Sequence, residues 1–175
     1  MGRHRSNGKS RTPRICTAHM DDRKGRFRLI RLYRDDDFET VTQFWFHAMD
    51  AAMPGLQTRL GHTLEGAREF FKNVVAVENQ LWVYELESKP VGFLGIHHNF
   101  IDRLYVDPAY HRRGIGQALL DHARTLSTDH LWLYTHASNK MARSFYEKNR
   151  FVAEKFGVSP PPESEPDVEY HWRRK

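Results

Sequence analysis

Hydrophobic and polar positions along the chain switch repeatedly between the two-residue period of a strand and the period of about 3.6 residues of a helix. Stretches of alternating, β-branched and aromatic residues bounded by turn residues predict strands. They are residues 27–33, 80–86, 90–97, 100–106, 130–135, 151–157 and 167–172. Stretches with apolar residues three and four positions apart predict amphipathic helices. They are residues 35–52, 63–74, 115–126 and 139–148.

The order of these elements defines the fold class. One strand and two helices precede three consecutive strands, the first two of which are joined by a turn at Glu87-Ser88-Lys89. Helices then alternate with strands, and two strands end the chain. This order predicts a mixed α/β domain, of the α+β kind, with an antiparallel front half and helical crossovers behind it.

Charge divides the chain at residue 26. Residues 1–26 hold eight Lys/Arg and two Asp/Glu, a net charge of +6, whereas residues 27–175 hold 19 basic and 20 acidic side chains. Because residues 1–26 also contain few apolar side chains, we expect a basic N-terminal tail that is disordered or an expression leader. Residues 27–175 are predicted to form a single domain. Its near neutrality argues against a nucleic-acid partner, although binding through the basic tail stays an alternative.

Cysteine content and hydropathy indicate the cellular compartment in which we expect the protein. Cys16 is the only cysteine, which excludes an internal disulfide or a cysteine zinc site and fits a reducing compartment. No stretch approaches the roughly 18 apolar residues of a membrane span. The basic start also lacks the apolar segment of a secretory signal. We therefore expect a cytoplasmic protein without a membrane partner.

A basic loop with two glycines joins the strand at 100–106 to the helix at 115–126, and it reads His111-Arg112-Arg113-Gly114-Ile115-Gly116. Glycine lets the backbone approach a ligand, and a helix start offers free N–H groups and the positive end of the helix dipole. Such a loop favours a phosphate or pyrophosphate. It is neither a P-loop nor a dinucleotide fingerprint. A strand-to-helix turn that needs small residues for packing explains the loop equally well.

A second pattern, from Asn139 to Lys148, reads Asn-Lys-Met-Ala-Arg-Ser-Phe-Tyr-Glu-Lys. Together, the two patterns resemble the GCN5-related N-acetyltransferase (GNAT) superfamily, whose motifs are Gln/Arg-x-x-Gly-x-Gly/Ala and Asn-x-x-Ala-x-x-Phe-Tyr-Glu-Lys. The resemblance covers residues 27–172. It departs from the family at His111, which replaces Gln or Arg, and at Arg150, which replaces a glycine suited to positive φ. The resemblance implies a twisted, mostly antiparallel sheet of about six to seven strands with helices on both faces.

The resemblance also implies the co-substrate and the residues that hold it. Members of the family transfer an acetyl group from acetyl-CoA to an amine without a metal. The loop would bind the CoA pyrophosphate, the backbone of the preceding strand would pair with the pantetheine arm, and a strand bulge would expose an N–H group to the thioester carbonyl. The implied cofactor-binding residues are Leu104, Tyr105, Val106, His111, Arg112, Arg113, Gly114, Ile115, Gly116, Gln117 and Asn139.

Tyr146 is the implied catalytic residue, since it matches the family tyrosine that protonates the departing thiolate. Taken alone, Tyr146 is better explained as a core aromatic residue, and only the full motif favours the catalytic role. A plain helix cap also explains Asn139. Arg143 and Lys148 are weaker candidates for cofactor phosphates. Phe100 stands near the position where some members have a glutamate base. The candidate bases are therefore Asp102, His97, His98 and His136.

The expected reaction is acetylation of a primary amine of a small molecule. The Pro-rich loop at 160–167 contains acids that would attract a cationic amine, although a solvated turn explains it as well. A protein N-terminal or lysine acetyltransferase is an alternative, and a non-catalytic acyl-CoA-binding module is an alternative of another class. A metal site at His97, His98 and Asp102 is not expected. The sequence leaves a homodimer open.

Overall fold

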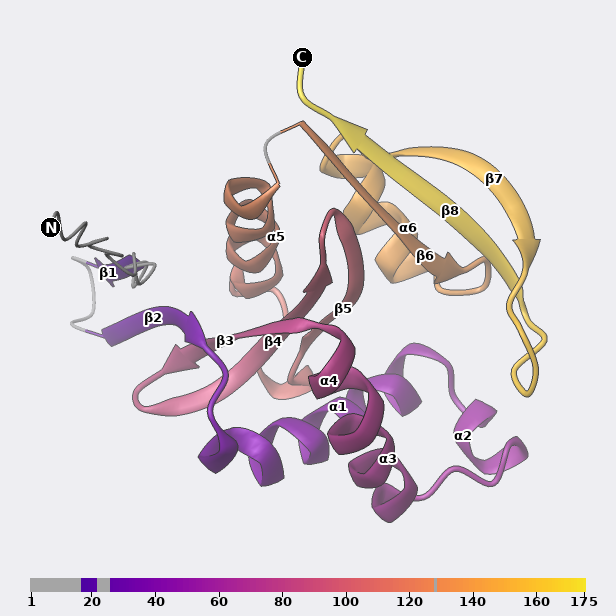
Figure 1. The fold of residues 1–175 in the computed structure, drawn as a ribbon, viewed down its shortest axis with the longest axis horizontal. Coiled ribbons are helices and arrows are strands. Elements are labelled where there is room, and N and C mark those ends of the chain that lie inside the picture. Colours follow the sequence, from indigo (N-terminus) through magenta and orange to yellow (C-terminus); the bar gives the residue numbers. More distant parts are fainter. Residues whose placement is uncertain (1–16, 22–25, 128) are drawn as a thin grey trace, which may run out of the picture.

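The computed structural model describes residues 17–21, 26–127 and 129–175 (Figure 1). Its strands are β1 (Thr17–Asp21), β2 (Arg26–Leu32), β3 (Gln80–Leu86), β4 (Lys89–His97), β5 (Phe100–Val106), β6 (His130–His136), β7 (Val152–Val158) and β8 (Pro166–Arg173). Its helices and helical turns are η1 (Asp35–Asp37), α1 (Phe38–Ala52), α2 (Leu56–Arg59), α3 (Leu64–Phe70), η2 (Phe71–Val75), α4 (Ala76–Glu78), η3 (Pro108–Tyr110), α5 (Ile115–Leu126) and α6 (Lys140–Lys148). Of these, β1, α2, α4 and η3 lie outside the predicted elements.

The strands form one eight-stranded sheet in the order β1-β2-β3-β4-β5-β6-β8-β7. Neighbouring strands are antiparallel except β5 and β6, which are parallel. The predicted mixed, mostly antiparallel sheet is confirmed, with one strand more than expected. That strand, β1, pairs with β2 and belongs to the segment that we expected to be a disordered tail. Residues 1–16 and 22–25 of that segment lie outside the described residues.

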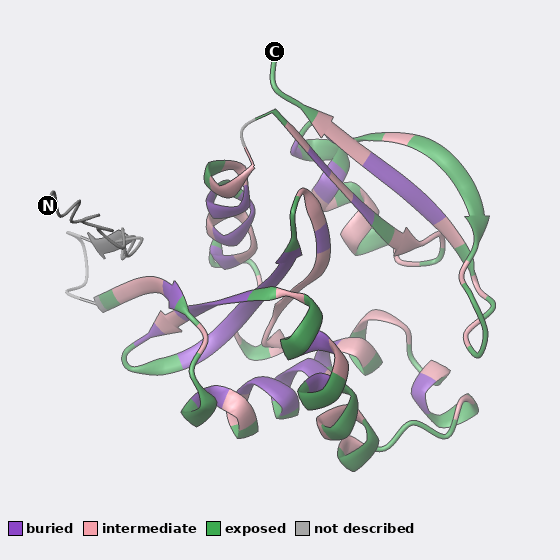
Figure 2. Cartoon of the chain, in the orientation of Figure 1, coloured by how far each residue is buried: buried purple, intermediate pink, exposed green. Residues whose placement is uncertain are grey.

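Helices cover both faces of the central strands (Figures 1 and 2). Alternation along β3 and β4 sends Trp82 and Leu94 to one face, where they pack in a cluster with the buried side of α5. The opposite alternation sends Val83 and Phe93 to the other face, against α1 and η2. A strand buried on both faces is apolar at nearly every position, which explains the continuous hydrophobic run in β4.

The sheet opens between β5 and β6. Among the described residues these strands pair only at Phe100 and Trp132, near their N-terminal ends. Asp102 is an extra residue in β5, opposite the junction of Gly95 and Ile96 on β4. Such a bulge bends its strand and increases the local twist, and beyond it β5 has an open edge.

The turn after α6 contains the departure from the family pattern noted in the sequence. Arg150 has a φ of 66°, in the left-handed region that favours glycine. The chain therefore keeps the geometry of a glycine turn with an arginine in it. Phe151, which follows, is buried in the same core as Tyr146. No helix among the described residues is both long and apolar enough to span a membrane.

Candidate active site

The backbone of the glycine loop has the shape of an anion cradle. Arg112 and Gly114 have φ angles of 60° and 81°, so the chain turns through the left-handed region just before α5. The first intrahelical bond of α5 runs from the Ala118 N–H to the Gly114 carbonyl, which leaves the preceding N–H groups without intrahelical partners. A Cβ atom on Gly114 would meet nothing within 4 Å. The loop therefore presents open space to the positive end of a helix dipole, which fits a pyrophosphate.

Side chains of the loop make local contacts. The Nε2 atom of His111 lies 3.0 Å from the carbonyl oxygen of Val106, the last residue of β5. The Arg113 guanidinium lies 5.0 Å from the centre of the Tyr110 ring. His111, which replaces the family's Gln or Arg, thus connects the loop to β5 through its contact with the Val106 carbonyl. Anion binding at this loop would then rest mainly on backbone N–H groups.

The open edge of β5 exposes backbone groups between the bulge and the loop. Asp107 donates its N–H to Val91 on β4, and backbone groups alternate between the two edges of a strand. Leu104 and Val106 therefore direct their N–H and C=O groups toward the gap, while those of Tyr105 point to Phe93 on β4. Of the three predicted pantetheine partners, two lie on the open edge. The Val106 carbonyl is already engaged by His111.

Tyr146 lies on the side of α6 that faces the core. Its ring contacts Phe151 and Tyr170, with centroid distances of 5.5 Å and 6.2 Å. Burial raises the pKa of Tyr146, and the nearby Tyr105 hydroxyl raises it further. The phenol is therefore protonated at neutral pH, as a proton donor must be. Asn139 caps the same helix, because its Oδ1 accepts the Ala142 N–H at 3.0 Å.

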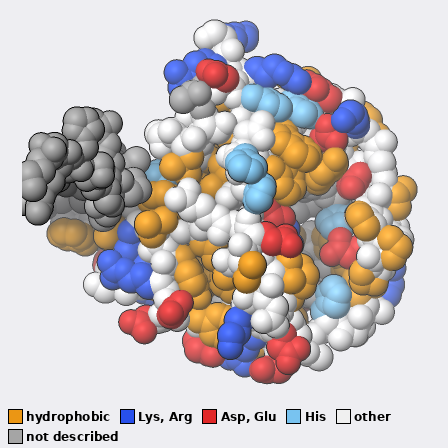
Figure 3. Space-filling view, in the orientation of Figure 1, with side chains coloured by type: hydrophobic (Ala, Val, Ile, Leu, Met, Phe, Trp, Pro, Cys, Tyr) orange, Lys and Arg blue, Asp and Glu red, His pale blue; other side chains and the backbone are white. Residues whose placement is uncertain are grey.

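A cleft of about 1200 Å³ begins where β5 and β6 separate. Helices α1 to α3 form one wall and strands β6 to β8 the other, and Figure 3 shows acidic and histidine side chains among hydrophobic ones around a hollow in this part of the surface. The aromatic lining residues are Trp45, Phe70, Phe100, Tyr105, Tyr134 and Phe156. The acidic ones are Asp102, Glu163, Asp167 and Glu169.

The loop between β7 and β8 covers one end of the cleft. Glu165 in this loop forms an ion pair with Arg59 of α2. Glu163 lies 3.4 Å from the Nε2 atom of His136, at the end of β6. The two contacts link the loop to both walls of the cleft.

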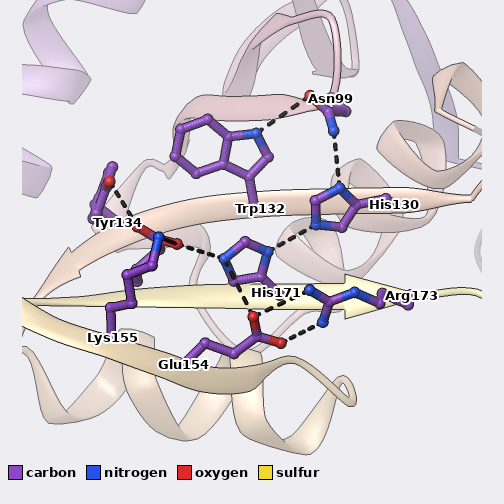
Figure 4. A network of polar contacts seen from close by, with 9 residues as sticks. Asn99, His130, Trp132, Tyr134, Glu154, Lys155, His171 and Arg173 are labelled. Carbon is purple, nitrogen blue, oxygen red and sulfur yellow. Dashed lines mark hydrogen bonds and ion pairs between the residues drawn. The ribbon is translucent and has the colours of Figure 1, made fainter.

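Polar side chains form a network along β6 and β8 (Figure 4). Glu169 accepts hydrogen bonds from Tyr134 at 2.8 Å and from Lys155 at 2.9 Å, and its Oε1 atom lies 2.6 Å from His171 Nε2. His171 Nδ1 lies 2.8 Å from His130 Nε2. These donors, led by His171, lower the pKa of Glu169 to about 2. The carboxylate is therefore ionised at any physiological pH.

Comparison with known proteins places this geometry in a family. The model of the acetyltransferase (GNAT) family matches residues 29–151. The chain belongs to this family. Its expected enzyme class, an acetyl-CoA-dependent acetyltransferase, is thereby confirmed, whereas the identity of the amine is not.

Two curated relatives come from Escherichia coli K12. The chain is 32% identical to the uncharacterized N-acetyltransferase YafP over 93 residues, which are 52% of this chain and 61% of YafP. It is 30% identical to the peptidyl-lysine N-acetyltransferase YjaB over 124 residues, which are 70% of this chain and 80% of YjaB.

Solved structures show the same fold. The solution structure of apo YjaB from E. coli superposes with a TM-score of 0.67 at 26% identity, covering 82% of this chain and 96% of that one. The PaiA N-acetyltransferase from Thermoplasma acidophilum, solved in complex with coenzyme A, has a TM-score of 0.58 at 23% identity, covering 83% and 99% of the two chains. The predicted GNAT fold is confirmed.

The four candidate bases separate into two groups. Asp102 and His136 line the cleft, whereas His97 and His98 do not. Both carboxylate oxygens of Asp102 are engaged, one by Asn79 at 2.8 Å and the other by Arg103 at 2.7 Å. His136 instead has a buried Nδ1 atom without a hydrogen-bond partner among the described residues.

The other predicted phosphate ligands have local partners or lie elsewhere. Arg143 donates to the Tyr170 hydroxyl at 3.2 Å and to the Ala137 carbonyl at 3.2 Å. Lys148 lines a separate small pocket with Arg124 and Arg150. Within the described part of the chain, no three His, Cys, Asp or Glu side chains are grouped as metal ligands.

Sequence reasoning missed Trp45, Phe70 and the network around Glu169. The local signal for the network was the pair Glu169 and His171, which stand two residues apart in β8 and therefore lie on the same face of the strand, opposite Val168 and Tyr170. Acidic side chains are rarely buried unless paired. The other partners of Glu169, Tyr134 and Lys155, come from β6 and β7, so no spacing within the sequence identifies them.

Proposed function

We propose that this acetyltransferase moves the acetyl group of acetyl-CoA to the primary amine of a small cationic molecule by direct attack. The observation that supports this most is the open edge of β5, which has the anion cradle at one end and the aromatic, acidic cleft beside it. A donor laid along that edge would bring its thioester to the entrance of the cleft.

We assign donor binding to the loop and the open strand edge. The N–H groups of Gly114, Ile115, Gly116 and Gln117 would hold the pyrophosphate, with His111, Arg112 and Arg113 shaping the loop. Leu104 and Val106 would pair with the pantetheine arm as if it were an added strand. PaiA, which has this fold, was solved with coenzyme A, in agreement with this assignment.

We assign the proton donor to Tyr146. When the amine nitrogen attacks the acetyl carbon, the carbon–sulfur bond breaks and the sulfur leaves as a thiolate. A tyrosine protonated at neutral pH delivers its proton to that thiolate. Backbone N–H groups beside the Asp102 bulge would stabilise the negative charge on the carbonyl oxygen.

We assign the proton acceptor to His136. It lines the cleft, its Nδ1 atom is buried without a partner in the described structure, and its Nε2 atom faces Glu163. A neighbouring carboxylate orients an imidazole. Glu163 itself has a lowered pKa because of its hydrogen bond with His136.

An acceptor panel tests the proposed function. Release of CoA is measured with acetyl-CoA and a series of small primary amines, at saturating donor, and mass spectrometry identifies the acetylated product. We expect turnover with small cationic amines. Tight acetyl-CoA binding without turnover of any amine or peptide would instead identify a non-catalytic binding module.

Peptidyl lysine is the second candidate acceptor, favoured by the name of the relative YjaB. The same assay with lysine-containing peptides and unmodified proteins separates the two acceptors. A kcat/KM for peptides above that of every free amine would favour peptidyl lysine. We expect the reverse, because the β7–β8 loop is tied to α2 across one end of the cleft.

A further inference from the structure

Glu169 is a buried carboxylate that faces the acceptor cleft. Its side chain is 6% exposed, yet it lines the cleft together with Tyr134 and Lys155. A buried ion is tolerated when hydrogen bonds satisfy it, and here His171, Tyr134 and Lys155 supply them. The sheet thus holds a fixed negative charge beside the space that the acceptor would occupy.

The three donors differ in how firmly they are held. Tyr134 and His171 come from β6 and β8, which pair with each other in the interior of this half of the sheet. Lys155 comes from β7, the edge strand of the described sheet, and its side chain is 73% exposed. Long, exposed lysine side chains gain little from an ion pair and lose rotamer freedom in making it. Lys155 is therefore the replaceable partner.

The contact between Lys155 and Glu169 also resembles the contact that a bound alkylamine would make. Its ammonium is a primary alkylammonium, and it lies 2.9 Å from the Glu169 carboxylate at the wall of the cleft. Phe100 stands 6.2 Å from the Tyr134 ring, centroid to centroid, and both rings line the same cleft. They offer apolar surface to the methylene chain of an aliphatic amine.

The low pKa of Glu169 excludes a role as the general base. A general base must accept a proton near neutral pH, whereas the pKa of this carboxylate is about 2. A permanently ionised group binds cations and does not take up their protons. The group thus fits a non-reacting ammonium of the acceptor.

We propose that Glu169 and Tyr134 form a subsite for a second, non-reacting ammonium group of the acceptor, which displaces Lys155. The preferred acceptor class is then an aliphatic amine with two cationic nitrogens, of which only the one nearer the thioester is acetylated. This inference rests on the proposed function and names its substrate class.

Matched amines test the subsite. We compare kcat/KM for a homologous series of α,ω-diamines with that for monoamines of equal length. The diamine should be favoured by about tenfold or more, the value of a charge-assisted hydrogen bond to a buried group. The Glu169→Gln variant should bring this ratio close to one. The chain length with the highest ratio reports the separation between the subsite and the reacting carbon.

Two further variants separate the subsite from general effects on folding. Glu154→Gln removes an acid that contacts the same network through His171 but does not line the cleft, so it should keep the diamine preference. Lys155→Met removes the competing ammonium and should raise the diamine-to-monoamine ratio by about two- to fivefold. A melting curve for each variant confirms that it is folded.

The outcomes distinguish this inference from the proposed function. Equal kcat/KM for both amine classes, or a ratio that Glu169→Gln leaves unchanged, would overturn the subsite while small-amine acetylation stands. If no small amine is acetylated, the proposed function fails, and calorimetry with the diamines decides about the subsite. Binding to the original protein that Glu169→Gln abolishes would support it, and no binding would overturn it.

Discussion

The two sides of the opening between β5 and β6 are built in different ways. On the β5 side, the loop and strand edge offer backbone N–H and C=O groups, set by the φ angles of Arg112 and Gly114. On the β6–β8 side, side chains such as Tyr134 and Glu169 project into the cleft and fix each other by hydrogen bonds. A backbone cradle fits a donor shared by a whole family, whereas a side-chain wall can change with the acceptor.

Because one side presents backbone groups and the other presents side chains, mutations on the two sides should have different effects. Substitutions on the β5 side should matter only where they change the path of the backbone, and most side chains there should be replaceable. Substitutions on the β6–β8 side should act through the identity of the side chain. Tyr146, the proton donor in the proposed mechanism, should be sensitive to loss of a single oxygen atom.

The largest effect is expected for Tyr146→Phe. In the proposed mechanism, removing the phenol proton leaves the thiolate without its donor, and general acids contribute about 100-fold or more to rate. We expect kcat to fall by about that factor while acetyl-CoA affinity, measured by calorimetry, stays within about twofold.

Tyr170→Phe is the matched control for this prediction. Its hydroxyl bonds to Glu147 at 2.6 Å and receives a bond from Arg143. Its loss should cost stability of about 1 kcal/mol and leave kcat close to its original value. Equal kcat for the original protein and Tyr146→Phe would remove Tyr146 from the mechanism.

An intermediate effect is expected for Gly114→Ala. A Cβ atom has room there, but a φ of 81° costs a non-glycine residue about 1–2 kcal/mol. We expect the loop to relax away from this conformation in the free protein, so that restoring it on binding raises the KM for acetyl-CoA by about tenfold, since about 1.4 kcal/mol corresponds to a factor of ten.

Gly116→Ala provides the comparison. Gly116 lies inside α5, where a Cβ atom would meet the Phe145 ring at 3.6 Å, an ordinary contact. Alanine is the better helix former, so this variant should be as stable as the original or more so. If Gly114→Ala and Gly116→Ala weakened acetyl-CoA binding equally, the left-handed turn at Gly114 would not be the feature that the anion cradle requires.

The smallest effect concerns the pH dependence of stability on the β6–β8 side. The pKa of Glu169 is lowered to about 2 in the folded chain, below the value of about 4.3 for an unfolded glutamate. Its stabilising contribution is therefore complete above pH of about 5 and is lost as the pH falls toward 2.

Melting temperatures of the original protein and Glu169→Gln test this prediction. At pH 7 the variant should melt about 5 °C lower, because charge-assisted hydrogen bonds are worth about 1.5–3 kcal/mol in a domain of this size. The gap should close as the pH falls through that window. A gap that is constant with pH would show that packing, and not charge, is the source.

The sequence predicted the fold to the extent that local patterns determine it. Seven of the strands and the helices α5 and α6 were predicted within two residues of their observed bounds, because alternation and helical spacing are strong where one face is buried. β1 was missed because its residues lie among basic and polar neighbours, and pairing with β2 makes it a strand. α2 was missed because a single turn has no period to recognise.

The candidate site divides in the same way. The sequence by itself determined the loop from His111 to Gly116 and the helix that contains Tyr146, since backbone geometry and helix packing are written in neighbouring residues. Only the tertiary structure decided that Glu169 meets Tyr134 and Lys155, and that His136 lies in the cleft while His97 does not. Cross-strand pairing joins residues far apart in the chain, so its register is fixed by the folded sheet and not by any local pattern.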